Sequence, residues 1–223
     1  MANLIFDYDG TIHNSMKTYA PAFRKTIKWL SDNGYTEERE YSDNEISYWL
    51  GFNSTDMWNA FMPGLDAEIK EKARSILGRD MAQRVRNGEG ELYPHTEETL
   101  KKLRSAGHTL IFLSNCRIRY MELHKSVFGL DRFFDYFYCC EEFDFLPKYQ
   151  IFRLFSLQHK GKFIVIGDRF HDIETAVKNG LSSIGCKYGY GSPEELSSAD
   201  LTVDSIDDLP NAIDALTHRP STI

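Results

Sequence analysis

The chain has few cysteines and lacks the patterns that mark a disulfide framework or a metal clip. Its four cysteines show no Cys-x-x-Cys spacing, and two of them, Cys139 and Cys140, are adjacent. Buried thiols in a reducing compartment are the favoured interpretation. The sequence also lacks a charged-then-apolar secretion signal, since a carboxylate already stands at Asp7, and no apolar run is long enough to span a bilayer. We therefore expect a cytoplasmic protein with no membrane partner.

An excess of positive charge is missing as well. The formal net charge is -7 and the isoelectric point is near 5.5, which argues against nucleic acid or an anionic membrane surface as a partner. A small phosphate bound at a local positive site stays possible. The composition, with 42% hydrophobic and 26% charged residues, is that of a soluble globular protein. A length of 223 residues suffices for one α/β domain, or for one domain that carries an insertion.

The most informative segment is Leu-Ile-Phe-Asp-Tyr-Asp-Gly-Thr at residues 4–11. If residues 4–6 form a buried strand, the two-residue period of a strand directs Asp7 and Asp9 to the same side. Two crowded carboxylates repel each other, so the pair suits a site where a cation or a phosphoryl group balances them. A simple Asp-Gly turn is one alternative. A calcium loop is another, but its glycine belongs at the sixth position and its glutamate at the twelfth, where this chain has Ile12 and Thr18.

From Tyr93 onwards the pattern predicts alternating helices and strands. The predicted helices cover residues 96–106, 117–127, 149–158 and 172–179, with a short helix starting at Pro193. The predicted strands cover residues 108–113, 133–139, 163–166, 183–186 and 201–203, and the tail from His218 is expected to be loose. Apolar strands separated by helices indicate an α/β fold, a Rossmann-like parallel sheet with helices on both faces.

Residues 15–88, here called the helical insertion, show helical periodicity and no strand pattern. Four helices are expected there, and the aromatic residues Trp49, Phe52, Trp58 and Phe61 are interpreted mainly as its own core. The Rossmann-like core domain is predicted to comprise residues 1–14 and 89–223. Because the chain crosses between the two units at one place, the linkers at residues 13–15 and 87–91 are natural hinges for a lid.

Right-handed crossovers bring the carboxyl ends of all parallel strands to one edge of the sheet, where such folds bind ligands. Asp7 and Asp9, Ser114 and Asn115, and the pair Asp168 and Asp172 each follow an apolar strand.

Asp7 is the candidate nucleophile, because a carboxylate can attack phosphorus and divide one displacement into two. Asp9 is the candidate general acid and base. Asp168 together with Asp7 is predicted to hold Mg²⁺, and Asp172 to orient a metal-bound water. The alternative role for Asp168 and Asp172 is to cap the N-terminus of the following helix and to compensate the helix dipole.

The candidates for binding phosphate are Ser114, Asn115 and Lys148. Ser114 would donate its hydroxyl to a phosphoryl oxygen beside the backbone amide of Asn115, and it could equally cap the next helix. Lys148 would balance the charge of the carboxylates and the phosphoryl group, and we prefer it to the lysines near residue 160. Arg169 fits a phosphate contact or a surface ion pair equally well. His13 is interpreted as an exposed linker residue and not as a catalyst.

These residues resemble the haloacid dehalogenase superfamily over essentially the whole chain. Asp-Tyr-Asp-Gly-Thr at residues 7–11 is similar to the first family motif, Ser114 to the second, Lys148 to the third and Gly-Asp-Arg-Phe-His-Asp at residues 167–172 to the fourth. The resemblance implies a Mg²⁺-dependent phosphomonoesterase that works through an aspartyl-phosphate, with the backbone carbonyl of Asp9 also on the metal.

The helical insertion resembles the C1-type cap of the family, and the chain is most similar to phosphoglycolate-phosphatase-like members. Tyr-Gly-Tyr-Gly at residues 188–191, followed by Pro-Glu-Glu-Leu at residues 193–196, strengthens this resemblance. The chain departs from the commonest pattern at Arg169, at Asn14 and in the order Pro147-Lys148.

We therefore predict a phosphatase that acts on a small phosphorylated metabolite such as phosphoglycolate, a sugar phosphate or a nucleoside monophosphate. Two alternatives stay open: a phosphosugar mutase that uses the same residues, and a non-catalytic phosphate-binding module. A dehalogenase is disfavoured because Asp9 implies proton transfer to an oxygen leaving group. The residues of the helical insertion do not identify the substrate, and the oligomeric state cannot be read from the sequence.

Overall fold

The computed structural model describes residues 1–218, and within them one parallel sheet organises the chain. Its strands are β1 (Asn3–Phe6), β2 (Thr109–Ser114), β3 (Tyr136–Cys139), β4 (Phe163–Gly167), β5 (Ser182–Cys186) and β6 (Leu201–Val203). Their order across the sheet is β3-β2-β1-β4-β5-β6, and every neighbouring pair is parallel. The predicted Rossmann-like α/β fold is confirmed.

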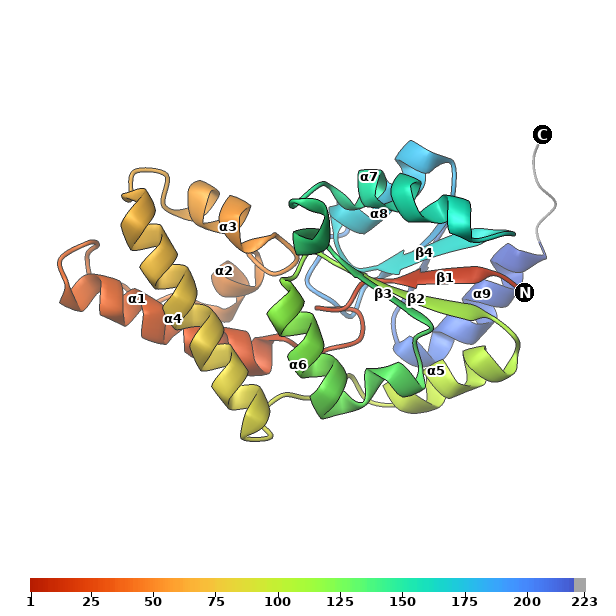
Figure 1. Ribbon diagram of the computed structural model, residues 1–223, viewed down its shortest axis with the longest axis horizontal. Helices are drawn as coiled ribbons and strands as arrows, with labels where there is room; N and C mark the ends of the chain where they lie inside the picture. The colour runs from red at the N-terminus through yellow and green to blue at the C-terminus, as the bar shows by residue number, and fades with distance from the viewer. Residues whose placement is uncertain (219–223) are drawn as a thin grey trace.

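Helices cover both faces of this sheet (Figure 1). In chain order the α-helices of the described residues are α1 (Met16–Asp32), α2 (Asp43–Ser47), α3 (Ser54–Phe61), α4 (Ala67–Arg86), α5 (Thr96–Ser105), α6 (Ile118–Phe128), α7 (Lys148–Phe155), α8 (Phe170–Asn179) and α9 (Leu209–Thr217). Helices α7 and α8 lie on one face, and α5, α6 and α9 lie on the other.

The alternation of side chains along β1 decides which face each residue serves. Leu4 and Phe6 are buried among the side chains of α5, α6 and α9, whereas Ile5 is buried on the side of α7 and α8. Asp7 follows two residues after Ile5 and therefore emerges on the α7 and α8 side. This register brings its carboxylate toward residues carried by those two helices.

The helical insertion contributes α1 to α4 and has an apolar cluster of its own. Trp58 is fully buried in that cluster, and Trp49, Phe52 and Phe61 pack against it, as predicted. In Figure 1 the insertion lies beyond the ends of the strands toward which their arrows point. The exact division at residues 14/15 and 88/89 stays a prediction, and the separate apolar cluster supports it.

Several local predictions were wrong. Of the four helices expected in the helical insertion, the second is short: α2 ends at Ser47, and the amides of Trp49 and Leu50 bond three residues back in the turns that follow. The segment from Pro193 forms turns instead of a helix. Helix α9 had not been predicted, although Pro at its second position is a typical start. The expected loose tail lies largely in residues 219–223, outside the described residues.

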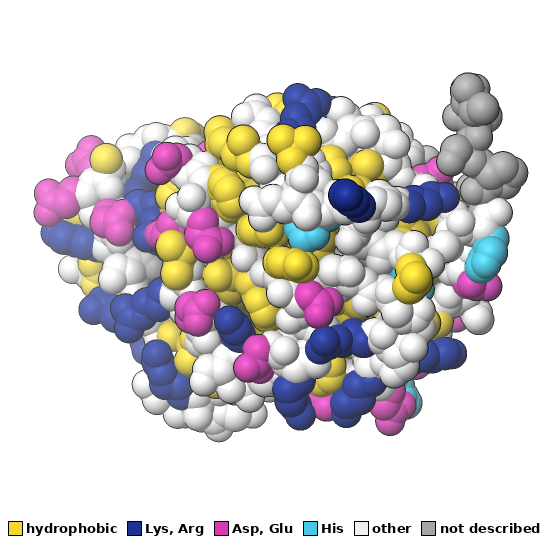
Figure 2. All heavy atoms as spheres, turned by 45° about the vertical axis from the view of Figure 1, so that its right-hand side comes forward, with side chains coloured by type: hydrophobic (Ala, Val, Ile, Leu, Met, Phe, Trp, Pro, Cys, Tyr) yellow, Lys and Arg dark blue, Asp and Glu magenta, His cyan; other side chains and the backbone are white. Residues whose placement is uncertain are grey.

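Figure 2 shows acidic and basic side chains interspersed on one face, with apolar side chains gathered near its middle. Among the described residues, no helix is both long enough and apolar enough to cross a membrane. Cys139, Cys140 and Cys186 are buried, as predicted, whereas Cys116 is half-buried.

Candidate active site

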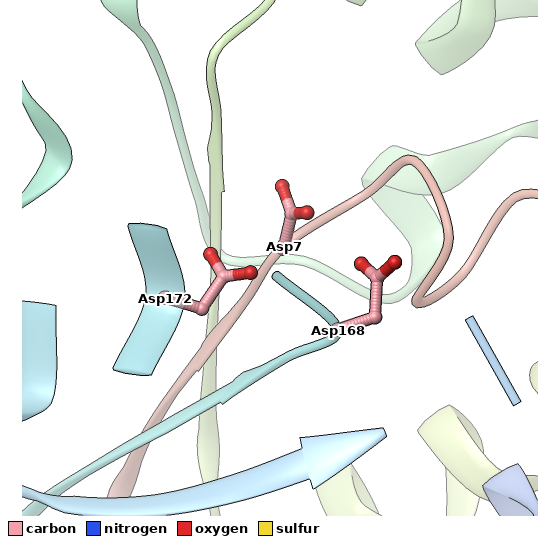
Figure 3. A group of neighbouring side chains, drawn as sticks. All are labelled: Asp7, Asp168 and Asp172. Carbon is pink, nitrogen blue, oxygen red and sulfur yellow. The ribbon is translucent and has the colours of Figure 1, made fainter. Parts of the chain in front are cut away.

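Three carboxylates meet at the carboxyl edge of the central strands. Asp7 follows β1, Asp168 follows β4, and Asp172 lies in the first turn of α8. Each offers an oxygen that lies within 4.8 Å of the others, and all three residues are buried. Figure 3 shows their carboxyl groups directed to the same side. The parallel topology thus unites residues that are far apart in sequence, as predicted.

Lys148 is the cation of this cluster. Its Nζ lies 2.6 Å from Asp7 and 2.7 Å from Asp172, and its side chain is only 3% exposed. Burial alone would lower the pKa of Lys148, but the two carboxylates outweigh burial and the net shift is upward. Lys148 is the first residue of α7, directly after Pro147, which places its side chain over the end of β1.

The cluster holds more negative charge than Lys148 can balance. Burial, together with repulsion by Asp172, raises the pKa of Asp7 to about 7 despite the opposing effect of Lys148. Burial, followed by repulsion from Asp7 and then from Asp172, raises the pKa of Asp168 well above its ordinary value. Three buried carboxylates facing one ammonium group fit a divalent cation that prefers oxygen ligands.

Asp168 is held in a close backbone cradle. Its carboxylate accepts hydrogen bonds from the Thr11 hydroxyl at 3.1 Å and from the Tyr190 amide at 2.7 Å. A Cβ at Gly10 would stand 2.2 Å from this carboxylate, and a Cβ at Gly189 would stand 2.3 Å from the Asp168 side chain. Gly10 also has a φ of +88°, which favours glycine. A side chain at Gly10 or Gly189 would therefore overlap the Asp168 side chain, so both positions require glycine.

Asp9 sits in a different environment at the edge of the helical insertion. The hydroxyls of Ser15 and Tyr120 each donate to its Oδ1 at 2.5 Å, and His13 Nδ1 lies 3.2 Å away. Burial raises the pKa of Asp9, but these partners outweigh it and leave the pKa below its ordinary value. The carboxylate is therefore fixed by residues from both the linker and α6.

The expectation that His13 is exposed was wrong. Its side chain is fully buried, stacked on Tyr8 at a centroid distance of 5.2 Å and set edge-on to His124 at 4.7 Å. The Tyr8 hydroxyl and His124 Nδ1 are 2.9 Å apart. A polar linker sequence gave no sign of this packing, because two of the rings that cover His13, those of His124 and Phe128, come from residues more than 100 positions later.

Ser114 and Asn115 end β2 beside β1. Ser114 is buried, and two positions before it Phe112 is paired with Phe6 in the sheet. The Asn115 side chain donates to the Gly51 carbonyl of the helical insertion at 2.8 Å, a role that the sequence did not suggest.

Arg169 is neither a surface residue nor part of a surface ion pair. Its side chain is 1% exposed and pairs with Glu195 at 2.9 Å, while its Nη1 donates to the carbonyl oxygens of Tyr48 and Leu50. It is thus a buried link between the loop after β4 and the helical insertion. Asp172 also accepts from the Arg169 amide, which is the helix-capping alternative considered above, in addition to its pairing with Lys148.

Sequence reasoning missed Ser15, Tyr120 and Tyr190 as site residues. Tyr190 donates its amide to Asp168, and its hydroxyl accepts from the Met16 amide at 3.1 Å. A signal existed only for Tyr190, which stands inside the Tyr-Gly-Tyr-Gly segment. Tyr120 follows Asp9 by 111 positions on an ordinary amphipathic helix.

Comparison with known proteins places this arrangement in a family. The sequence pattern of the haloacid dehalogenase-like hydrolases matches residues 4–186, a range that includes Asp7, Asp9, Lys148, Asp168 and Asp172. The chain belongs to this family.

Relatives of this family member include known phosphatases. A phosphoglycolate phosphatase of Vibrio vulnificus is 28% identical over 221 residues, covering 94% of this chain and 95% of its own. A glyceraldehyde 3-phosphate phosphatase of Methanocaldococcus jannaschii is 25% identical and covers 94% and 96%.

Among solved structures, one described as a predicted phosphatase from Clostridium acetobutylicum superimposes with a TM-score of 0.81 at 24% identity, covering 96% and 98% of the two chains. This likeness shows the shared fold. The family member described here is a phosphoric monoester hydrolase.

Proposed function

We propose that the protein is a Mg²⁺-dependent phosphatase that hydrolyses a small phosphomonoester through an aspartyl-phosphate on Asp7. The observation that carries this proposal is the position of Asp7 at the strand end, 2.6 Å from Lys148 and grouped with Asp168 and Asp172. The family match and the phosphatases among the relatives support the same reaction class. Phosphoglycolate is a candidate substrate because a relative is named for it.

Asp7 and Asp168 would hold the metal, with Asp172 nearby. A bound Mg²⁺ would screen the negative charge of the phosphoryl oxygens and make phosphorus more open to attack. Lys148 restrains the Asp7 carboxylate on its other side, so one Asp7 oxygen is oriented by the ammonium group while the second stays available. Ser114 and the Asn115 amide would bind the phosphoryl oxygens from the neighbouring strand.

The reaction then follows from the two acids. An Asp7 oxygen attacks phosphorus, the bond from phosphorus to the leaving oxygen breaks, and Asp9 supplies the proton to that oxygen. In the second step Asp9 accepts a proton from water, the water oxygen attacks phosphorus, and the Asp7–phosphorus bond breaks to release inorganic phosphate. The Ser15 and Tyr120 hydroxyls that contact Asp9 keep its carboxylate near the helical insertion, where the leaving group would lie.

A phosphate-release screen tests this proposal. The substrates are phosphoglycolate, sugar phosphates and nucleoside monophosphates, each assayed with Mg²⁺ and with a chelator. We expect release that requires Mg²⁺ and that Asp7→Asn abolishes. Asp131→Asn serves as the matched control, because Asp131 is exposed and far along the chain from the site, in the turn after α6.

Two outcomes would contradict the proposal. Undiminished release by Asp7→Asn would exclude the covalent step. Conversion of a sugar phosphate to its isomer with little free phosphate would show that sugar, and not water, accepts the phosphoryl group.

A further inference from the structure

A pocket between the helical insertion and the core opens at Asp9. It has a volume of about 540 Å³ and is bounded by α4, by the start of α6 and by the loop after α2. Asp9 and Asn115 lie in its wall, so it adjoins the position where the phosphoryl group would be transferred. Because Asp9 is the proposed acid for the leaving oxygen, this pocket is where a leaving group would extend.

Apolar and aromatic side chains form a large part of the pocket wall. They include Tyr19, Trp49, Phe52, Met57, Leu77 and Tyr120. Pockets of several hundred Å³ with such a lining usually hold ligands much larger than two carbon atoms. A glycolate leaving group would fill a small part of this volume and would leave the aromatic surfaces uncovered.

Positive charge gathers at the same pocket although the protein is acidic overall. Among the described residues, five arginines line it, against the two acidic residues Asp9 and Glu71. Arg74 on α4 donates to the Thr55 hydroxyl at 2.8 Å and pairs with Glu71. Its Nε is buried, and no partner for it exists within the described part of the chain.

Arg117 approaches from the core side at the start of α6. Its contacts are long, 3.4 Å from Nε to the Ser54 hydroxyl and 3.8 Å to the Glu141 carboxylate. Burial lowers the pKa of Arg74, the Glu71 carboxylate opposes that shift, and the charge of Arg117 lowers the pKa further. Arg74 contacts Thr55 and Arg117 contacts the adjacent Ser54, so the two guanidinium groups lie at the same part of the pocket wall. An anion bound between them would offset their positive charge.

We infer that this pocket binds the leaving group, and that the substrate is a phosphomonoester whose leaving group has a ring-sized apolar body and a second oxyanion. Arg74 and Arg117 bind that oxyanion, and the aromatic wall covers the body. This inference rests on the proposed phosphatase function and names its substrate class.

The test compares two aryl phosphates, phenyl phosphate and 4-carboxyphenyl phosphate. The measured quantity is the ratio of kcat/KM for the carboxylated compound to that for the neutral one. Because the ratio is compared between enzyme variants, the intrinsic reactivity of the two compounds cancels. We expect the ratio to fall at least tenfold in Arg74→Gln and in Arg117→Gln, and to fall less in Arg74→Lys, which keeps the charge.

Arg24→Gln is the matched control. Arg24 is another arginine of the helical insertion, but it pairs with Asp43 at 2.5 Å and does not line the pocket. The control is expected to keep the ratio of the unmodified protein. Thermal melts of all variants show whether each is folded.

Three results are decisive. A ratio unchanged in both Arg74→Gln and Arg117→Gln overturns the oxyanion site. A kcat/KM for phosphoglycolate that exceeds that for 4-carboxyphenyl phosphate overturns the inference that the leaving group has a ring-sized apolar body. Absence of Mg²⁺-dependent release from every compound contradicts the proposed phosphatase function itself, which distinguishes that failure from the first two.

Discussion

Replacing Lys148 by methionine tests the electrostatic account of the site. Its Nζ contacts two carboxylates at 2.6 and 2.7 Å, and all three side chains are at most 4% exposed. Methionine keeps most of the volume but removes the only ammonium group that contacts these carboxylates within the described residues. Asp7, Asp168 and Asp172 would then repel one another without a cation to offset them.

The magnitude follows from removing one partner of a buried pair, which costs about 3–5 kcal/mol. For a chain of this size, a loss of 1 kcal/mol lowers Tm by roughly 2–4 °C, so Lys148→Met should melt about 6–20 °C lower in the presence of a chelator. The difference should narrow as the pH is lowered from about 8 to 5, because protonated carboxyl groups need no cation. Phosphatase activity should be lost.

Thermal melts followed by circular dichroism, with chelator and across a Mg²⁺ titration, measure this effect. Because the variant site is more negative, Mg²⁺ should raise its Tm by more than it raises that of the unmodified protein. Lys160→Met is the control, since Lys160 is exposed before the start of β4, at the far end of that strand. Equal melting of the two variants in chelator, or a smaller Mg²⁺ effect in Lys148→Met, would refute the reasoning.

Three further perturbations address other contacts. Tyr120→Phe removes one hydroxyl donor to Asp9. We expect kcat/KM to fall about tenfold and the limb of the pH–rate profile that depends on Asp9 to move to higher pH. An unchanged profile would show that the contact is not needed. Arg169→Met removes the guanidinium group that pairs with Glu195 and donates to two carbonyl oxygens. The protein should lose about 2–4 kcal/mol of stability, and hydrogen exchange at residues 48–52 should accelerate. Unchanged exchange would contradict the link. Burial lowers the pKa of His124 to about 3, below its unfolded value of about 6.5. The free energy of unfolding should therefore fall by about 2 kcal/mol between pH 6.5 and pH 5. Urea unfolding of His124→Phe at both pH values should show a decrease that is smaller by this amount.

The sequence by itself determined the fold class and the positions of most helices and strands. Continuous apolar strands such as residues 163–166 and helical periodicity such as residues 67–85 are local patterns, and they persist because each element buries the face that its own sequence makes apolar. The sequence also indicated that Asp7, Asp168 and Lys148 come together. Parallel strands bring their carboxyl ends to one edge whatever the details of packing.

Only the tertiary structure decided the contacts made by side chains over long separations. Arg169 stands inside the segment of residues 167–172, directly after Asp168, yet its partners lie about 120 positions earlier and 26 positions later. His13 has a polar neighbourhood in sequence but lies under aromatic rings from α6. The pocket at Asp9 likewise joins α4 to α6, two helices whose own patterns predict amphipathic surfaces and no cavity. Helical and strand periodicity depend on residues that are close in sequence, whereas the cavity between the helical insertion and the core depends on how these two units pack.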